Sequence, residues 1–254
     1  MLRLPRTSYL PGICLAGTLI AAACSDSPAE PEALLGVPEY RSALRAAEDL
    51  PTVPRLIDRI PVEGAPEALS QARIYWEGAR RAEDSATAEA WREASYRLAA
   101  PVLAAWLDSA DLAGAQAALE RWIRIASWLV GAEGLAPGAF EDLGPAVAEA
   151  AALLGRAREA AAAGDRVAAI EATLQAADRL EVTTPPELAR RLILRAETTL
   201  VARRREGGAE GQTHDVALRR AQRLTLGARQ AFAEADYVLA LQRSYYALRL
   251  LEAE

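Results

Sequence analysis

The chain has 254 residues, 52% of them hydrophobic, and its 35 acidic and 29 basic residues give a formal net charge of -6. This length and apolar content can supply a buried core, which excludes disorder throughout the chain. The acidic balance argues against nucleic-acid binding, because such binding relies on basic side chains that neutralise phosphates.

Residues 1–23 have the pattern of an export signal. Arg3 and Arg6 give a positive start, an apolar run from Ile13 to Ala23 follows, and small side chains end it. The run is too short for a permanent membrane span. We therefore predict export, with cleavage before Cys24.

Cys24, directly after this run, resembles the lipid-modified cysteine of a bacterial lipobox. Ala21 stands where that motif usually has Leu, and the same residues also suit the ordinary signal peptidase, which would leave a free thiol. Cys14 would leave with the signal, so Cys24 would be the one cysteine of the mature chain, and acylation explains it best. The resemblance implies a covalent lipid on Cys24; we expect no other cofactor.

The residues after Cys24 indicate location and organisation. Ser25 rather than Asp follows the cysteine, which by resemblance to sorted bacterial lipoproteins implies the outer membrane, at its periplasmic or its surface face. Residues 24–38 hold three prolines among acidic residues and are predicted to be an extended tether. Residues 39–254 are predicted to form one α-helical, repeat-like domain.

From residue 39 onward, apolar residues recur at three- and four-residue spacing, and the alternation typical of strands is missing. The pattern predicts an all-α fold. Helix breaks are predicted at Pro51 and Pro54, Gly64–Pro66, Asp84–Ser85, Gly131–Gly138 and Gly207–Gly211, and a capping box at Thr184–Glu187. Four Glu–Arg pairs at four-residue spacing indicate exposed helix sides: Glu77–Arg81, Glu93–Arg97, Glu120–Arg124 and Glu187–Arg191.

Residues 157–181 align without gaps on residues 228–252, with ten identities at an offset of 71. In both copies an Asp falls at the turn, and alanines occupy the three small-residue positions: Ala157, Ala169 and Ala176, then Ala228, Ala240 and Ala247. These positions resemble those at which the two helices of a tetratricopeptide repeat approach closely. The resemblance implies stacked antiparallel helix hairpins, as a tetratricopeptide-like array or an irregular helical bundle.

The copies depart from that family at its large residues. Ala160 and Ala231 replace the bulky residue of the first helix, and Thr173 and Ser244 replace the aromatic of the second. A weaker third copy is predicted with its turn at Asp111, with Ala115 in one small slot and Leu103 and Trp122 in the other two. A long helix from Pro185 to Arg205 separates the two good copies, so the predicted period is three helices.

The sequence offers few catalytic or metal-binding groups. His214 is the only histidine, which excludes two-histidine metal sites, and its place at a helix start favours a structural role over that of a general base. There is no Gly-rich phosphate loop, GxSxG or CxxC motif. Glu83–Asp84 is interpreted as a solvated turn. Arg203–Arg205 suits a helix C-terminus, and contact with anionic headgroups is the alternative. We predict no catalytic residues and no metal site.

All five tryptophans, Trp76, Trp91, Trp106, Trp122 and Trp128, lie between residues 76 and 128. They could fill gaps between Ala-lined helices, or stack on sugars and anchor a peptide. Trp76 and Trp91 have the more polar neighbours, so we predict a ligand or partner surface at Trp76, Trp91, Tyr75 and Tyr96. A second aromatic cluster, Tyr237, Tyr245 and Tyr246, is interpreted as core packing, and an exposed end cap or partner surface is the alternative.

These observations predict a membrane-anchored lipoprotein acting as a non-catalytic protein-binding or scaffold module at the cell envelope, with an envelope protein as partner. Helical-repeat lipoproteins of barrel assembly and secretin piloting have such roles, so this expectation rests on resemblance. The alternative is a glycan- or small-ligand-binding lipoprotein that uses the Trp-rich region 76–128, as the resemblance to starch-utilisation lipoproteins implies. Enzymatic activity is the third reading.

Overall fold

The computed structural model describes residues 50–60, 67–131, 140–206 and 212–252, apart from the side chains of 206 and 212–215. All of them belong to the unit Pro38–Glu254. The predicted signal, Cys24 and the tether lie outside the described residues, as do most of the loops predicted around 131–138 and 207–211. No helix in the described ranges has the length and apolar content that a membrane span requires.

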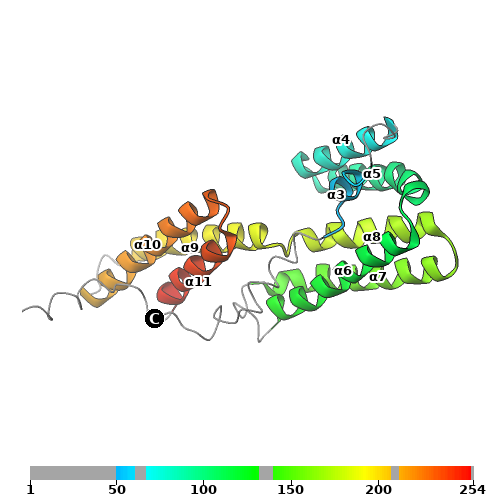
Figure 1. The fold of residues 1–254 in the computed structure, drawn as a ribbon. Helices are drawn as coiled ribbons and strands as arrows, with labels where there is room; N and C mark the ends of the chain where they lie inside the picture. The colour runs from blue at the N-terminus through cyan, green and yellow to red at the C-terminus, as the bar shows by residue number, and fades with distance from the viewer. Residues whose placement is uncertain (1–49, 61–66, 132–139, 207–211, 253–254) are drawn as a thin grey trace, which may run out of the picture. The chain divides into compact units, whose positions relative to one another are not determined.

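The described residues form helices and no strand, so the predicted all-α fold is confirmed (Figure 1). The helices are α3 (Val53–Ile57), α4 (Glu67–Arg81), α5 (Ser85–Trp106), α6 (Ser109–Val130), a 3-10 helix η3 (Glu141–Leu143), α7 (Gly144–Ala162), α8 (Arg166–Glu181), α9 (Pro185–Glu206), α10 (Gln212–Ala233) and α11 (Tyr237–Glu252).

Four helices begin at an aspartate whose carboxylate accepts a hydrogen bond from a backbone N–H three residues later. This contact satisfies a donor that the first helical turn leaves unpaired. The bonds run from Thr87 to Asp84, from Asp111 to Asp108, from Ala168 to Asp165 and from Leu239 to Asp236, at 2.8–3.0 Å. The sequence therefore marks these helix starts directly.

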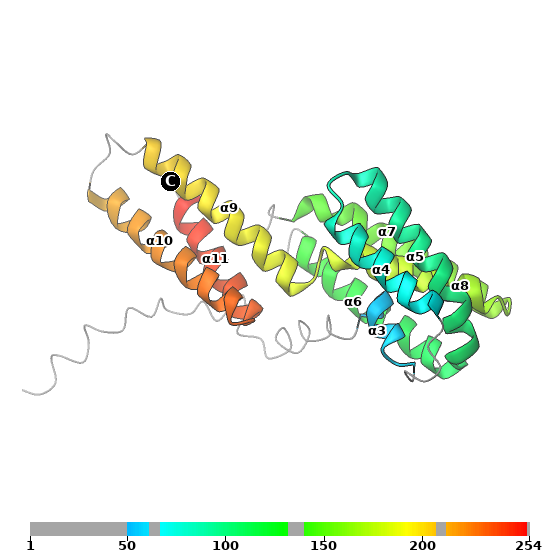
Figure 2. The same cartoon turned by 90° about the horizontal axis from the view of Figure 1, so that it is seen from above.

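Three pairs of consecutive helices form the main antiparallel hairpins. α4 packs on α5, α7 on α8 and α10 on α11, while α5 also packs on α8, and α9 packs on both α10 and α11 (Figures 1 and 2). An amphipathic hairpin cannot bury its apolar stripe alone, so these further contacts complete the burial.

The two aligned segments have the same turn. Gly164 in the α7–α8 turn and Ala235 in the α10–α11 turn both have positive φ, 81° and 61°. In each turn the N–H of the next residue, Asp165 or Asp236, donates over 2.9 Å to the carbonyl five residues before it. The backbone thus repeats at the offset of 71 that the alignment predicts.

The packing positions of the two hairpins repeat as well. The six alanines predicted to allow close approach are all fully buried: Ala157, Ala169, Ala176, Ala228, Ala240 and Ala247. Thr173 and Ser244, at equivalent positions of the two hairpins, are also buried, and each donates its hydroxyl to the carbonyl four residues earlier, at 2.7 and 2.6 Å. Each polar group is thereby satisfied inside the hairpin.

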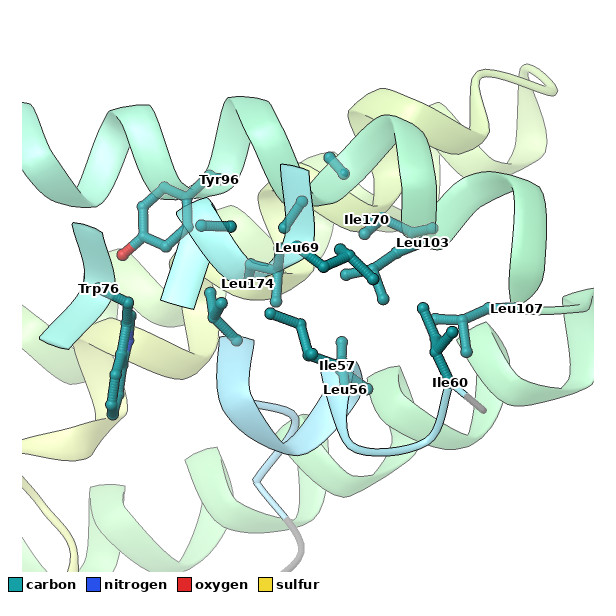
Figure 3. Packing of buried hydrophobic residues seen from close by; sticks show 14 of the residues in the cluster. Leu56, Ile57, Ile60, Leu69, Trp76, Tyr96, Leu103, Leu107, Ile170 and Leu174 are labelled. Atoms are coloured by element: carbon teal, nitrogen blue, oxygen red, sulfur yellow. The ribbon is translucent and has the colours of Figure 1, made fainter. Parts of the chain in front are cut away.

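A hydrophobic cluster joins α3, α4, α5 and α8. Leu69, Leu103 and Leu174 are at its centre, and Figure 3 shows Trp76 at its edge and the Tyr96 hydroxyl directed away from the leucines. Elsewhere, Trp122 of α6 is fully buried and donates its indole N–H to the Thr183 hydroxyl over 3.0 Å.

Three details of the predicted organisation are wrong or differ. The predicted turn at Asp111 falls at Asp108, because Asp108 caps α6 and Asp111, inside its first turn, completes a capping box. Glu120 pairs with Arg158 of α7 at 2.7 Å rather than with Arg124. In the predicted capping box, the Thr184 hydroxyl donates to the Glu181 carbonyl, and Glu187 pairs with arginines of α9.

Candidate functional site

Three helices each contribute two polar or aromatic side chains to one place at the edge of the hydrophobic cluster. The spacing within each helix is three or four residues, which puts both side chains on one face. We call the six residues the acid–arginine junction: Trp76 and Arg80 from α4, Arg92 and Tyr96 from α5, and Asp178 and Glu181 from α8.

Ion pairs connect the three helices at this junction. The Arg80 guanidinium lies 3.2 Å from the Glu181 carboxylate and 4.9 Å from the centroid of the Trp76 ring, which it covers on one face. Arg92 Nε lies 3.0 Å from Asp178 Oδ2 and forms an ion pair with it. The Nε–H group is not aligned for a hydrogen bond to any acceptor. Asp178 is thus tied to α5 and Glu181 to α4.

The Tyr96 hydroxyl completes the junction, because it is hydrogen-bonded to the Asp178 carboxylate. A second layer surrounds this contact on the solvent side. Arg179, next to Asp178, pairs with Glu89 of α5 at 2.8 Å and with Glu149 of α7 at 3.1 Å. Four helices are therefore linked by one charge network.

Burial determines the protonation behaviour of the junction. It raises the pKa of the Asp178 carboxyl, and the nearby Arg92 and the Tyr96 hydrogen bond oppose the rise. Burial likewise raises the pKa of Glu181, with the Arg80 guanidinium opposing it. It also raises the pKa of the Tyr96 hydroxyl, together with the charge of Asp178, so Tyr96 stays protonated.

A cleft of about 1390 Å³ opens beside the junction. Its walls come from residues 50–55, from α4, from the end of α8 with the start of α9, and from the α10–α11 turn. Charges of both signs line it, five arginines and six acidic residues: Arg55, Arg73, Arg80, Arg92, Arg190, Glu77, Asp178, Glu181, Glu187, Glu234 and Asp236. Trp76, Phe232 and Tyr237 add aromatic surface.

Of the four residues predicted to form a ligand or partner surface, Trp76 alone lines the cleft, and most of its ring is buried. Trp91 is 40% exposed and lies across Gly78, where a Cβ would come within 2.4 Å of the ring. Tyr96 is buried, and Tyr75 is half-buried. The structure thus brings Trp76 and Tyr96 to the junction and places Trp91 outside the cleft.

The other predicted groups are dispersed. Trp106 and Trp128 are 48% and 40% exposed, and neither lines the cleft. The backbone of His214 lies in the first turn of α10. Asp84 caps α5, and its pKa is lowered by the hydrogen bond from Thr87.

None of the predicted site residues belongs to the charged half of the junction, which consists of Arg80, Arg92, Asp178 and Glu181. Asp178 offered one signal, because it lies among buried positions of α8, where Ala177 and Leu180 are fully buried. An acid on a buried helix face needs a partner of opposite charge or a hydrogen bond. Its partner Arg92 lies 86 residues away in the sequence, so spacing alone could not identify it.

Each carboxylate of the junction is engaged by an arginine, Glu181 by Arg80 and Asp178 by Arg92. Among the described residues, no three His, Cys, Asp or Glu side chains are grouped so as to hold a metal ion.

No protein family matches this chain, and neither the curated proteins nor the solved structures include one that is significantly similar to it.

Proposed function

We propose that this chain is a lipid-anchored, non-catalytic module of the cell envelope that binds a segment of a partner protein in the cleft beside the acid–arginine junction. The observation that carries the proposal is the cleft, with its size, its mixed charge and its aromatic walls. Stacked hairpins that resemble tetratricopeptide repeats supply the walls, and the lipobox-like Cys24 supplies the location.

The size of the cleft favours a peptide segment over a small molecule. Small-molecule sites usually occupy about 300–1,000 Å³ and enclose their ligand. The cleft of about 1390 Å³ is larger than that and is open to solvent. An extended stretch of a partner protein could lie along it.

The charges of the cleft favour a protein over a polymer of uniform charge. Arg80 is paired with Glu181, and Arg190 with Glu187 at 2.6 Å. Each pair offers one cation and one anion, so a partner with side chains of both signs could bind to both members of a pair. A peptide carries both signs and aromatic side chains, whereas a nucleic acid presents only negative phosphates.

Glycan binding is the second candidate, and the exposed tryptophans favour it. Trp91, Trp106 and Trp128 are each at least 40% exposed, and an exposed indole can stack on a sugar ring. Quenching of tryptophan fluorescence by oligosaccharides, in a Trp76→Phe variant as well as in the wild type, would favour this second candidate.

Charge reversal of Arg190 tests the peptide-binding proposal. Arg190→Glu removes a cleft cation that pairs with Glu187, and Arg158→Glu is the matched control, because Arg158 is a similarly exposed arginine that pairs with Glu120 away from the cleft. We expect an envelope protein to copurify from native membranes with the wild type and the control, and to be reduced at least about tenfold with Arg190→Glu. Equal recovery with all three would refute binding at the cleft.

The location has its own test. The mass of the protein purified from its own membrane should correspond to residues 24–254 plus covalent acyl chains, and Cys24→Ser should move the chain to the soluble fraction. A native mass without acyl chains would refute the anchor.

A further inference from the structure

The α9–α10 hairpin carries a charge opposite to that of the rest of the chain. Between Pro185 and Ala233 there are ten arginines and five acidic residues, whereas the other residues comprise 19 arginines and 30 acidic residues. A hairpin of net positive charge is therefore part of an acidic protein, and it would be attracted to surfaces that repel the remainder.

An ion pair between Glu197 and Arg229 shows which sides of α9 and α10 meet. Leu194 and Val201 lie three residues before and four residues after Glu197, and Leu226 lies three residues before Arg229. Residues at these spacings share a helix face. All three aliphatic side chains therefore flank the seam between α9 and α10, and they are 56%, 46% and 57% exposed.

Arginines at one end of the same hairpin are available for an external partner. Arg204 and Arg205 on α9 and Arg220 and Arg223 on α10 are exposed, and none of them pairs with a carboxylate in the described part of the chain. By contrast, Arg195 pairs with Glu252 at 2.9 Å. We call Leu194, Val201, Leu226, Arg204, Arg205 and Arg223 the basic–aliphatic face.

We propose that the basic–aliphatic face docks on anionic lipid headgroups. Arginine beside exposed Leu and Val is the combination that binds at a membrane surface, where the cations meet lipid phosphates and the aliphatic groups enter the acyl boundary. A nucleic acid would use the arginines, but it gives no reason for three half-exposed aliphatic side chains along one seam. Docking adds an orientation to the proposed anchor at Cys24, and it does not depend on that anchor.

Vesicle binding of the full chain carrying Cys24→Ser tests the proposal without the lipid. Residues 1–23 are common to all variants, so the comparison between variants isolates the hairpin. Co-sedimentation is measured with phosphatidylcholine vesicles with and without 30% phosphatidylglycerol. Arg204→Glu/Arg223→Glu is compared with Arg121→Glu/Arg156→Glu, which makes the same change at exposed arginines of α6 and α7.

We expect partitioning onto the anionic vesicles to fall at least about tenfold with Arg204→Glu/Arg223→Glu and less than about threefold with the control pair, since each surface cation contributes about fivefold. Val201→Ser/Leu226→Ser should weaken binding to the same vesicles more than Ile74→Ser/Val167→Ser, which alters exposed aliphatic residues elsewhere. Circular dichroism confirms that each variant is folded.

Equal binding of the two charge variants would overturn the proposal. So would binding that depends on the arginines and is unaffected by Val201→Ser/Leu226→Ser, because the aliphatic side chains would then not enter the acyl boundary and charge attraction alone would hold the chain at the headgroups. These outcomes do not bear on the cleft, which is tested separately by Arg190→Glu.

Discussion

The α7–α8 and α10–α11 hairpins share one backbone design and differ in what their second helices carry. Both turns have a residue with positive φ, an aspartate cap and the same small buried residues. Asp178 of α8 lies in the acid–arginine junction, whereas Arg249 is exposed at the equivalent position of α11. The turn and the small residues thus build the hairpin, and a few polar positions decide whether it forms a site.

One polar position is conserved in role between the two hairpins. Glu181 of α8 pairs with Arg80, and the equivalent Glu252 of α11 pairs with Arg195. Each hairpin thus uses its last glutamate to fasten a neighbouring helix. Paired substitutions in the two hairpins test how far the equivalence extends.

The largest effect is expected at the small buried positions. Ala169→Leu and Ala240→Leu each force an extra isobutyl group into a closed helix contact, so each should lower the free energy of unfolding by about 2–3 kcal/mol in urea denaturation. Ala162→Leu and Ala233→Leu make the same change at exposed positions that are equivalent in the two hairpins. Each should change the free energy of unfolding by less than about 0.5 kcal/mol. A large loss in only one hairpin would show that the two do not pack alike.

The aspartate caps should matter equally in the two hairpins. Asp165→Ala and Asp236→Ala each remove the acceptor of one N-terminal amide, so each should cost about 1 kcal/mol of unfolding free energy. Thermal and urea denaturation can both measure the loss. If only one of the two variants is destabilised, the turns are not equivalent.

Substitution of the two positive-φ residues should change the free energy of unfolding in opposite directions. Gly164→Ala places a Cβ at φ 81°, and although no atom lies within 4 Å of it, backbone strain should cost about 0.5–1 kcal/mol. Ala235→Gly relieves the same strain, so it should stabilise the chain by a similar amount. Loss of stability in both variants would contradict the shared turn.

The smallest expected effect is a pH dependence of the unfolding free energy that arises at Asp178 of α8 and not at Arg249, the equivalent position of α11. Because the pKa of Asp178 is raised in the folded chain, the unfolded chain loses its proton first as pH rises above 3.8. The free energy of unfolding of the wild type should therefore fall relative to Asp178→Asn until the pH exceeds the raised pKa, and then level off. Measurement from pH 3 to pH 8 gives the profile, and Arg249→Gln should show no such change.

Asp84→Asn is the control of opposite sign. The pKa of Asp84 is lowered, so the wild type should gain stability relative to this variant as pH rises toward and past 3.8. If the difference in unfolding free energy between the wild type and Asp178→Asn does not change with pH, the Asp178 carboxyl is not shielded from water.

The sequence predicts what depends on neighbours along the chain. Helix starts at Asp84 and Asp165, the buried alanines and the two equivalent hairpins follow from capping chemistry and from the alignment. The turn predicted at Asp111 lies three residues earlier, at Asp108, because both acids belong to one capping box and either fits the sequence pattern of a helix start. Local patterns therefore give the elements with small errors.

What depends on the packing of distant helices could not be predicted. Trp106 and Trp122 both occur in apolar stripes, yet Trp106 ends α5 and is half-exposed, whereas Trp122 is fully buried. Glu120 pairs across to α7 instead of within α6. Likewise, the junction requires α4, α5 and α8 to converge, which no spacing within one helix encodes.

Site-specific photo-crosslinking in native membranes tests the proposed peptide-binding cleft most directly. A photoreactive residue in place of Glu77, which lines the cleft, is compared with one in place of Glu93, which is equally exposed on α5 outside it. We predict an adduct with one envelope protein from position 77 and none from position 93. No adduct from position 77, or the same adduct from both positions, would contradict the account.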